Sequence, residues 1–200
     1  MIPLQKKSRL TFITALVIWN LLSSEVPAEI IFEKEEIAVY RTILHQGRLF
    51  TKNRILIHEH STGDTLQAIA HEEKESLMKE LNFPTEIFDD WKEKNSSRRK
   101  IAKSLNLSID YDVLTKSEFD FIFQNSDLEV AWRVFAKKYE NTDGFIRLSK
   151  PGFDKGKKSS LVLVEYHCGP NCGTGRFLSL RKNDSETWVT ESSILMWMAY

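Results

Sequence analysis

A single-domain α+β fold is predicted by three observations. Amphipathic helical patterns concentrate before residue 140, strand patterns follow one another after residue 144, and only turn-rich segments separate these last strands. Successive strands without helices between them are typical of an antiparallel meander. We therefore expect a C-terminal antiparallel β-meander that packs against amphipathic helices, with residues 29–200 forming the domain.

The first 28 residues have the layout of a secretory signal peptide. A start with three basic residues precedes an apolar stretch over residues 10–22, and Val26-Pro27-Ala28 offers a small-residue cleavage site. This stretch is too short for a helix across a hydrocarbon core of roughly 30 Å. We expect an exported protein, periplasmic or extracellular, without stable membrane insertion after cleavage.

The composition narrows the classes of function. Removal of residues 1–28 takes away three basic residues and one acidic residue, which changes the formal net charge from 0 to −2. That balance favours neither nucleic acid nor an anionic membrane surface as a partner. The chain has no phosphate-binding Gly-Lys-Ser/Thr loop, no nucleophile elbow and no dinucleotide fingerprint. Standard nucleotide enzymes and α/β-hydrolases are therefore disfavoured, and no cofactor is predicted.

Helices and strands alternate in the first half of the chain. Apolar residues at helical spacing predict a helix over residues 32–46, and Gly47 is placed to cap it. A short β-branched run predicts a strand over residues 54–61. Asp64 can cap the next helix, which is expected over residues 65–81. Pro84 then opens a short helix that carries three large apolar residues, Ile87, Phe88 and Trp91.

The middle of the chain begins with a polar segment, residues 92–103, which is expected to be a solvated surface loop. Strict alternation of apolar and polar residues then predicts a strand over residues 105–111. Capping-box patterns start two helices, one with Thr115 and Glu118 and one with Ser126 and Glu129. The second pattern leads into an amphipathic helix up to Tyr139, in which Trp132 is expected to cover the sheet.

Strands are predicted over four segments of the last third: residues 145–149, 161–168, 176–182 and 187–198. Turn-rich segments, including residues 150–159 and 182–185, separate them. The second and third strands form a hairpin, in which Pro170 and Asn171 suit the two central positions of a turn from Gly169 to Cys172. Gly173 and Gly175 indicate a bulge just after that turn.

Both cysteines of the chain, Cys168 and Cys172, lie at the tip of this hairpin. In an oxidising compartment a disulfide is expected. Two alternatives stay open. Cys168, with His167 beside it, could be a redox thiolate, although three residues separate the cysteines where thioredoxin-type motifs have two. The cysteines could also complete a Cys2His2 zinc site with His58 and His60, if the two strands are neighbours.

The segment from His58 to Asp64 has some of the features of metal-dependent hydrolases, in which imidazoles and a carboxylate hold an ion that activates water. His58 and His60 lie two residues apart on a predicted strand and so point to one face, whereas Glu59 points to the other. The competing interpretation is a polar, solvated edge strand. Acidic residues on the predicted helices, such as Asp89 and Asp90, are expected to be solvated as well.

Several segments between residues 84 and 198 form a recognisable set: Phe88-Asp-Asp-Trp91 with Lys94-Asn95, Leu148-Ser-Lys-Pro-Gly-Phe153, Leu161-Val-Leu-Val164, the Cys-Gly-x-x-Cys-Gly-x-Gly run from Cys168 to Gly175, Trp188 and Trp197. In these segments the region resembles a family of uncharacterised bacterial exported proteins. Pro151 departs from the family pattern, in which the corresponding segment leads into the hairpin without proline. The resemblance implies an exported, single-domain bacterial protein and assigns no catalytic residue.

Two hypotheses about function follow. The first is a non-enzymatic exported domain that binds an envelope or extracellular ligand through the hairpin and the face of its sheet. The second is a metal-assisted hydrolase that uses His58, His60 and Asp64. Binding predicts oxidised cysteines and no tightly held ion, whereas hydrolysis predicts an ion that is lost when either histidine is replaced.

Overall fold

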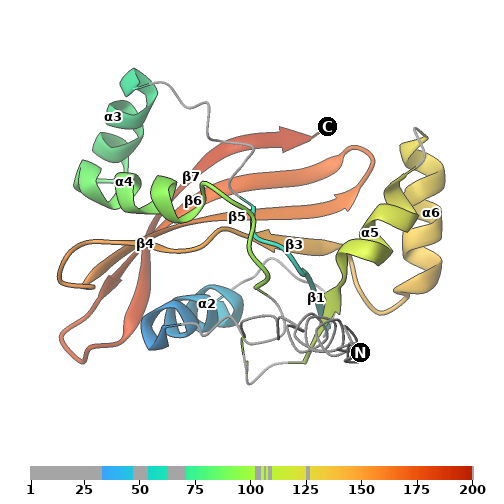
Figure 1. The fold of residues 1–200 in the computed structure, drawn as a ribbon, viewed down its shortest axis with the longest axis horizontal. Coiled ribbons are helices and arrows are strands. Elements are labelled where there is room, and N and C mark those ends of the chain that lie inside the picture. The colour runs from blue at the N-terminus through green and yellow to red at the C-terminus, as the bar shows by residue number, and fades with distance from the viewer. Residues whose placement is uncertain are drawn as a thin grey trace, which may run out of the picture. The chain divides into compact units, whose positions relative to one another are not determined.

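The strands form one mixed sheet, antiparallel towards its C-terminal edge and parallel towards the other (Figure 1). The computed structural model describes residues 33–46, 54–62, 71–101, 105, 107, 110–124 and 127–199, which contain five helices and seven strands. The strand order is β2-β1-β3-β5-β6-β7, and β4 pairs with β5. The predicted α+β class is therefore confirmed. The predicted signal peptide lies outside the described residues and stays a prediction.

Five helices are described: α2 (Lys34–Gln46), α3 (His71–Glu80), α4 (Thr85–Lys94), α5 (Lys116–Phe123) and α6 (Leu128–Lys138). The strands are β1 (Ile55–His58), β2 (Tyr111–Leu114), β3 (Phe145–Leu148), β4 (Gly152–Phe153), β5 (Ser159–Gly169), β6 (Cys172–Lys182) and β7 (Trp188–Ala199). The helices predicted from apolar periodicity are confirmed where they are described. The proposed caps Gly47 and Asp64 lie outside the described residues.

The predicted C-terminal meander is present. Strands β5, β6 and β7 run antiparallel, and β3 pairs antiparallel with β5, which places Phe145 opposite His167. The short strand β4 was not predicted, because its residues fall in a turn-rich segment. It forms because α4 lies directly over it: a Cβ at Gly152 would be 2.5 Å from the carbonyl oxygen of Ile87. Only a glycine permits so close an approach.

Strand β1 is an inner strand, so the expected solvated edge strand is wrong. It pairs in parallel with β2 on one side and with β3 on the other, and all four of its residues are buried. Inner parallel strands have both faces covered and read as continuous apolar runs rather than alternating ones. The run Ile55-Leu56-Ile57 is such a signal.

The strand predicted over residues 105–111 lies further along the chain than expected. Of its described residues, Leu105, Leu107, Asp110 and Tyr111, only Tyr111 belongs to β2; residues 106, 108 and 109 lie outside the described residues. Pairing with β1 decides which residues form β2. Ile55 lies opposite Tyr111, and His58 lies opposite Leu114. Local alternation carries no information about this partner.

The polar segment 92–103 was expected to be a solvated loop, and for its described residues this is wrong in part. Helix α4 extends to Lys94, and Asn95 and Ile101 are 3% and 1% exposed. The amide nitrogen of Ile101 donates to the carbonyl oxygen of Glu59 (2.8 Å), and that of Ser61 donates to Arg99 (2.8 Å). Backbone hydrogen bonds to the chain after β1 thus hold a segment whose side chains are mostly polar.

Side chains cap the two helices after β2. Thr115 and Glu118 form the predicted capping box at the start of α5. At α6 the capping residue is Asp127, whose carboxylate accepts from the amide of Val130 (3.1 Å), so the box predicted there is corrected. Aspartate caps a helix as well as serine does. Ser126 lies outside the described residues.

Two helix pairs cover different parts of one sheet face. Helices α3 and α4 pack on Leu161, Leu163 and Phe177 of β5 and β6. Helices α5 and α6 pack on Leu56 and Phe145, at the other end of the strand order. His167 lies opposite Phe145 and on the same side of β5 as Leu163, because side chains of a strand alternate. Both pairs therefore share this face, and the hairpin tip projects beside α5 and α6 (Figure 1).

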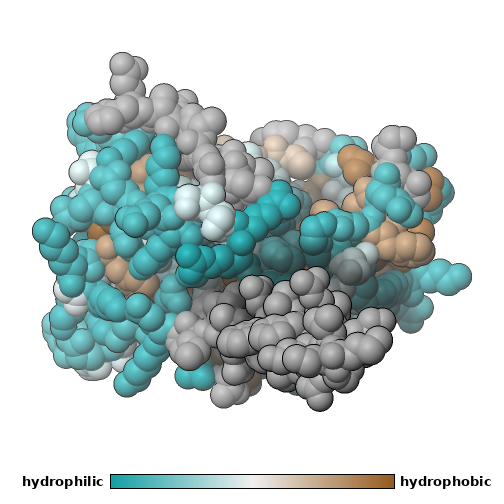
Figure 2. Space-filling view, viewed as in Figure 1, coloured by the Kyte–Doolittle hydropathy of each residue, from teal (hydrophilic) through white to brown (hydrophobic). Residues whose placement is uncertain are grey.

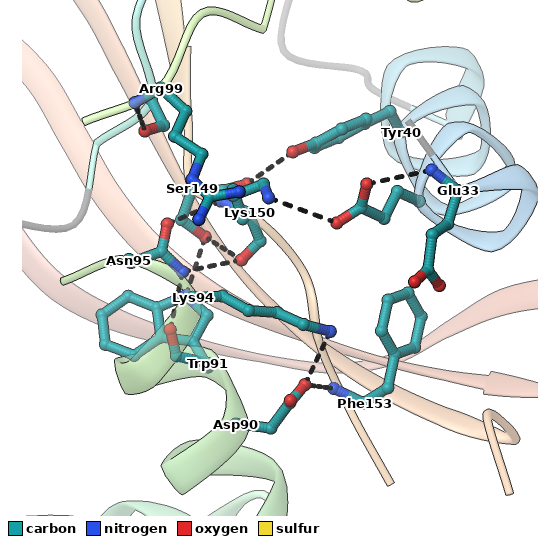
Figure 3. A network of polar contacts seen from close by, with 12 residues as sticks. Glu33, Tyr40, Asp90, Trp91, Lys94, Asn95, Arg99, Ser149, Lys150 and Phe153 are labelled. Atoms are coloured by element: carbon teal, nitrogen blue, oxygen red, sulfur yellow. Dashed lines mark hydrogen bonds and ion pairs between the residues drawn. The ribbon is translucent and has the colours of Figure 1, made fainter. Parts of the chain in front are cut away.

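A buried polar network joins α2 and α4 to the end of β3 (Figure 3). Ser149 is fully buried, and its hydroxyl oxygen accepts from the indole N–H of Trp91 (2.8 Å) and from the amide of Leu163 (2.8 Å). Its carbonyl oxygen accepts from the hydroxyl of Tyr40 (3.0 Å). The amide group of Asn95 bridges the carbonyl oxygen (2.9 Å) and the amide nitrogen (2.7 Å) of Lys150.

Replacing Ser149 by alanine should lower the free energy of unfolding by about 3 kcal/mol. The substitution leaves the Trp91 and Leu163 N–H groups buried without this acceptor, and each such group costs roughly 1–3 kcal/mol. Urea unfolding at pH 7 measures the change. The matched control is Ser193→Ala on the exposed side of β7, which should change the stability by less than about 0.5 kcal/mol. Equal stability of the two variants would contradict the role given to Ser149.

Candidate functional site

The hairpin of β5 and β6 ends in a two-residue turn that a disulfide closes. Gly169 pairs with Cys172 across the turn at Pro170 and Asn171, and Cys168 is bonded to Cys172 with a Cα–Cα distance of 5.0 Å. The predicted turn and disulfide are thus present. Sulfur atoms bonded to each other are not thiolates, so in this form the cysteines do not serve as zinc ligands.

The expectation that His58 belongs to a polar, solvent-facing surface is wrong. The side chain is 5% exposed, because β1 is an inner strand and α5 lies over it. Its ring meets the ring of Phe119 edge to face, with 4.9 Å between the centroids. Its Nδ1 lies 3.1 Å from the backbone nitrogen of His60, so only Nε2 is left for another partner.

Both histidines are neutral at pH 7. Burial lowers the pKa of His58 to about 4, and nearby Arg147 acts in the same direction. Burial also lowers the pKa of His60 from its ordinary value. An uncharged imidazole can donate or accept a hydrogen bond without adding charge to the site.

The four residues considered for a zinc site are not brought together as a set. His58 is on β1 and Cys168 on β5, with β3 between them, and the sulfur atoms are bonded to each other. Within the described part of the chain, no group of three or more His, Cys, Asp or Glu side chains is placed to hold a metal ion. Asp64, the third ligand considered for a hydrolase, lies outside the described residues.

A cavity of about 280 Å³ lies between the hairpin tip and helices α5 and α6; we call it the aromatic hollow. Its lining comes from α5, α6, β3, the hairpin and the end of β7: Phe119, Phe123, Leu128, Trp132, Phe145, Arg147, His167, Gly169, Pro170, Cys172, Gly173, Trp197 and Ala199. The rings of Trp132 and His167 each stack on Phe145, with interplanar angles of 15°. Apolar walls with a few polar groups are typical of small-molecule sites.

The hairpin side of this hollow is formed by Trp197, whose ring lies against two glycines of β6. A Cβ at Gly175 would be 2.0 Å from Nε1 of Trp197, and one at Gly173 would be 3.1 Å from its Cζ3. The ring centroids of Trp197 and His167 are 5.3 Å apart. The two glycines of the Cys-Gly-x-Gly segment therefore leave room for the indole ring of Trp197. The bulge expected near these glycines is present as a register shift between Gly175 and Arg176.

Arg147, which lines the aromatic hollow, pairs with a buried carboxylate of the neighbouring strand β5. Glu165 is 2% exposed, and its Oε2 accepts from the hydroxyl of Thr62 (2.8 Å) and lies 3.4 Å from Nη1 of Arg147. Burial opposes the ionisation of Glu165, but His167, Arg147 and Thr62 together hold its pKa below the usual value. The carboxylate is therefore ionised at pH 7 and pairs with the guanidinium.

Three buried nitrogen atoms have no hydrogen-bond partner among the described residues. They are Nε of Arg147, Nε2 of His167 and Nδ1 of His60, all buried. Nε2 of His167 is 3.9 Å from Glu165, which is longer than a hydrogen bond. Buried polar atoms of native proteins nearly always have partners, so those near a cavity are the ones that a bound molecule would satisfy.

A second cavity of about 290 Å³ adjoins the first; we call it the basic hollow. Its lining residues are His58, His60, Arg98, Lys116, Phe119, Asp120 and Arg147. Phe119 and Arg147 line both hollows, so these two side chains lie at the boundary between them. Among the described residues of the lining the one carboxylate is that of Asp120, which binds Lys116 one helical turn away.

Helices α5 and α6 carry exposed apolar residues. Phe121 of α5 and Leu128 and Val134 of α6 are 66%, 51% and 41% exposed, and apolar residues gather over these helices in Figure 2. Leu128 also lines the hollow.

Sequence reasoning missed Arg147 and Glu165 and did not assign the aromatic residues of α5 and α6 to a site. For Arg147 and Glu165 the sequence does contain a signal that could have indicated a site. Each is a charged residue within an apolar strand, Phe145-Ile-Arg-Leu148 and Leu161-Val-Leu-Val-Glu165. Charged residues are almost never fully buried unless they are paired, so such positions indicate a buried ion pair or a site. The convergence of the rings has no comparable local signal.

No protein-family model, curated protein or solved structure matches this chain. The helices in the described part of the chain include none that is both long and apolar enough to span a bilayer. The geometry of the two hollows is therefore the basis for a functional proposal.

Replacing both Cys168 and Cys172 by serine should lower the free energy of unfolding by about 2 kcal/mol or less. The disulfide closes a loop of only five residues, for which the loss of chain entropy in the unfolded state is small. Urea unfolding without reductant measures the difference. A variant that no longer folds would show that the disulfide does more than hold the hairpin tip.

Acidification from pH 7 to pH 5 should lower the free energy of unfolding by about 2 kcal/mol through His58 alone. The unfolded chain takes up a proton at this residue near pH 6.5, whereas the folded protein does so only near pH 4, so stability is lost as the pH falls. His60 acts in the same direction.

The test is the variant His58→Asn, whose amide oxygen can accept from the amide of His60 in place of Nδ1. Chemical unfolding at several pH values should show a smaller loss of stability between pH 7 and pH 5 than in the wild type. Between pH 7 and pH 8 the two curves should run parallel. An unchanged loss below pH 7 would mean that His58 is protonated in the folded protein.

Proposed function

We propose that this protein is an exported, non-enzymatic binding domain that holds a small apolar molecule in the aromatic hollow. The observation that carries the proposal is the cavity between the hairpin tip and helices α5 and α6, with its stacked rings. Its volume of about 280 Å³ is close to the lower end of the range for ligand pockets, roughly 300–1,000 Å³. A ligand of one or two rings fits that size.

The site has the features of a binding site rather than those of a catalytic one. The polar groups at its base are engaged in holding each other, as in the contacts of Glu165 with Arg147 and Thr62. The disulfide at the hairpin tip is the form that cysteines adopt in oxidising compartments, which supports export. The N-terminal 28 residues support it independently.

A metal-assisted hydrolase with His58 and His60 is the weaker hypothesis. The basic hollow contains three cationic side chains, Arg98, Lys116 and Arg147, and cations repel a divalent metal ion. His58 also uses Nδ1 for the backbone of His60.

The binding proposal is tested with 2-naphthamide, an uncharged two-ring probe, and ¹⁵N-labelled protein. Two tryptophans of the hollow, Trp132 and Trp197, supply indole N–H resonances that should shift in a saturable manner. Trp91 lies in the separate core of α3 and α4 and should not shift. Uniform small shifts, or none, would contradict the proposal.

The variant Ala199→Phe places a ring in the hollow and should weaken probe binding by roughly tenfold or more, because the cavity is then filled. The matched control is Met198→Phe, one residue earlier on β7, whose side chain points to the other face and is 40% exposed. It should bind the probe as the wild type does. Equal weakening by both substitutions would place the probe elsewhere.

A further inference from the structure

We propose that the disulfide between Cys168 and Cys172 regulates the aromatic hollow: the oxidised protein binds the ligand, and reduction of the disulfide by a dithiol weakens this binding. The inference rests on the proposed function and adds the regulation of the same site. It is carried by three observations: the part of the lining that the hairpin tip supplies, the type of turn at that tip, and the exposure of the disulfide to solvent.

The hairpin tip, which projects beside α5 and α6, supplies one wall of the aromatic hollow (Figure 1). His167, one residue before the disulfide, lines the hollow too, and its ring stacks on that of Phe145 with 4.9 Å between the centroids. A change in the position of the tip relative to the helices therefore changes the cavity. The lining residues of the tip are Gly169, Pro170, Cys172 and Gly173.

The turn at this tip does not match the twist of the strands that it joins. Gly169 pairs with Cys172, so the loop has two residues, Pro170 and Asn171. Two-residue hairpins favour turns of types I′ and II′, which need a positive φ at the first loop residue, whereas types I and II splay the strands. The ring of Pro170 holds φ at about −65° and excludes both favoured types. Neither loop residue is among the described residues with a positive φ.

The disulfide opposes this splaying. It joins Cys168 of β5 to Cys172 of β6, with 5.0 Å between the Cα atoms. A register shift between His167 and Gly169 interrupts the pairing of the strands at Cys168, so the covalent bond crosses the hairpin where the ladder is irregular. Once the bond is broken, the chain beyond His167 and Gly173 is held by one backbone pair and a turn that favours splayed strands.

The disulfide is accessible to a dithiol, because Cys172 is exposed and Cys168 is half-buried. A thiolate of the dithiol attacks Sγ of Cys172 and forms a mixed disulfide, and Cys168 leaves as a thiolate that takes up a proton. The second thiolate of the dithiol then attacks the reductant's own sulfur in the mixed disulfide and releases Cys172, which is protonated in turn. The protein gains two electrons and two protons, and the dithiol becomes a disulfide.

The experiment measures binding of 2-naphthamide to the full mature protein before and after reduction with dithiothreitol. Titration of ¹⁵N-labelled protein follows the indole N–H resonances of Trp132 and Trp197 in the hollow. We expect the reduced protein to bind the probe at least about fivefold more weakly. The resonance of Trp91, in the separate core of α3 and α4, should keep its position, because reduction opens the tip and leaves the domain folded.

The reverse effect is a second measurement, because two coupled equilibria affect each other by the same factor. Saturating probe should lower the reduction potential of the disulfide by about 20 mV for a fivefold difference in affinity, since a tenfold difference corresponds to about 30 mV for a two-electron couple. The potential is obtained by equilibration with mixtures of reduced and oxidised dithiothreitol, followed by alkylation of the thiols and mass spectrometry. A potential that the probe leaves unchanged would overturn the inference.

Variants test the role given to the turn. The double variant Cys168→Ser/Cys172→Ser should bind the probe as the reduced protein does, with or without dithiothreitol. The variant Pro170→Asn/Asn171→Gly keeps the cysteines and supplies a type I′ turn, which matches the twist of the hairpin. Its oxidised and reduced forms should bind the probe within about twofold of each other, because the strands then stay paired without the cross-link. Comparison within this variant removes the effect of the lost Pro170 contact.

The outcomes separate this inference from the proposed function. If oxidised and reduced wild-type protein bind the probe equally, the inference is overturned and the binding function stands. If the oxidised protein does not bind the probe, the proposed function fails and the inference fails with it. A shift of the Trp91 resonance to its unfolded position on reduction, or an undiminished redox effect in Pro170→Asn/Asn171→Gly, would contradict a local opening of the tip.

Discussion

The arrangement of the helices depends on the buried polar groups where β3 ends. The backbone turns inwards at Ser149 and Lys150, away from solvent, so each of their polar groups needs a partner within the protein. Trp91 and Asn95 of the α4 region supply partners from one side, and Tyr40 of α2 supplies one from another. Because an unpaired buried group costs more than a hydrogen bond gains, this network favours the observed position of α4.

The position of α4 in turn decides which part of the sheet stays uncovered. With α3 and α4 held over β5 and β6, the aromatic cluster of α5 and α6 packs near β1 and β3. The hairpin tip projects beside that second cluster without a helix of its own. Trp197 lies flat on the glycines of β6 and forms a wall there, rather than filling the space completely. The aromatic hollow is the space that stays unfilled between the hairpin tip and helices α5 and α6.

Burial and charge act together at this site. Burial keeps His58 neutral, whereas Glu165 stays ionised despite its burial because Arg147, His167 and Thr62 surround it. Arg147 is thereby held between a fixed internal carboxylate and two open cavities. An arginine in this position is already oriented before any ligand arrives, and preorganisation of this kind reduces the entropy lost on binding.

The sequence by itself determined the features that depend on neighbouring residues. The α+β class, the amphipathic helices, the hairpin with its turn at Pro170 and Asn171, and the disulfide between Cys168 and Cys172 were all predicted from local patterns. The tertiary structure alone decided the parallel pairing that makes β1 an inner strand, the partner that positions β2, and the burial of the polar segment around Asn95. It also decided the candidate site, because Arg147, Glu165 and Trp197 lie on three strands that meet only in the folded sheet. Periodicity reports which side of an element is buried, whereas the partner on that side is set by long-range packing.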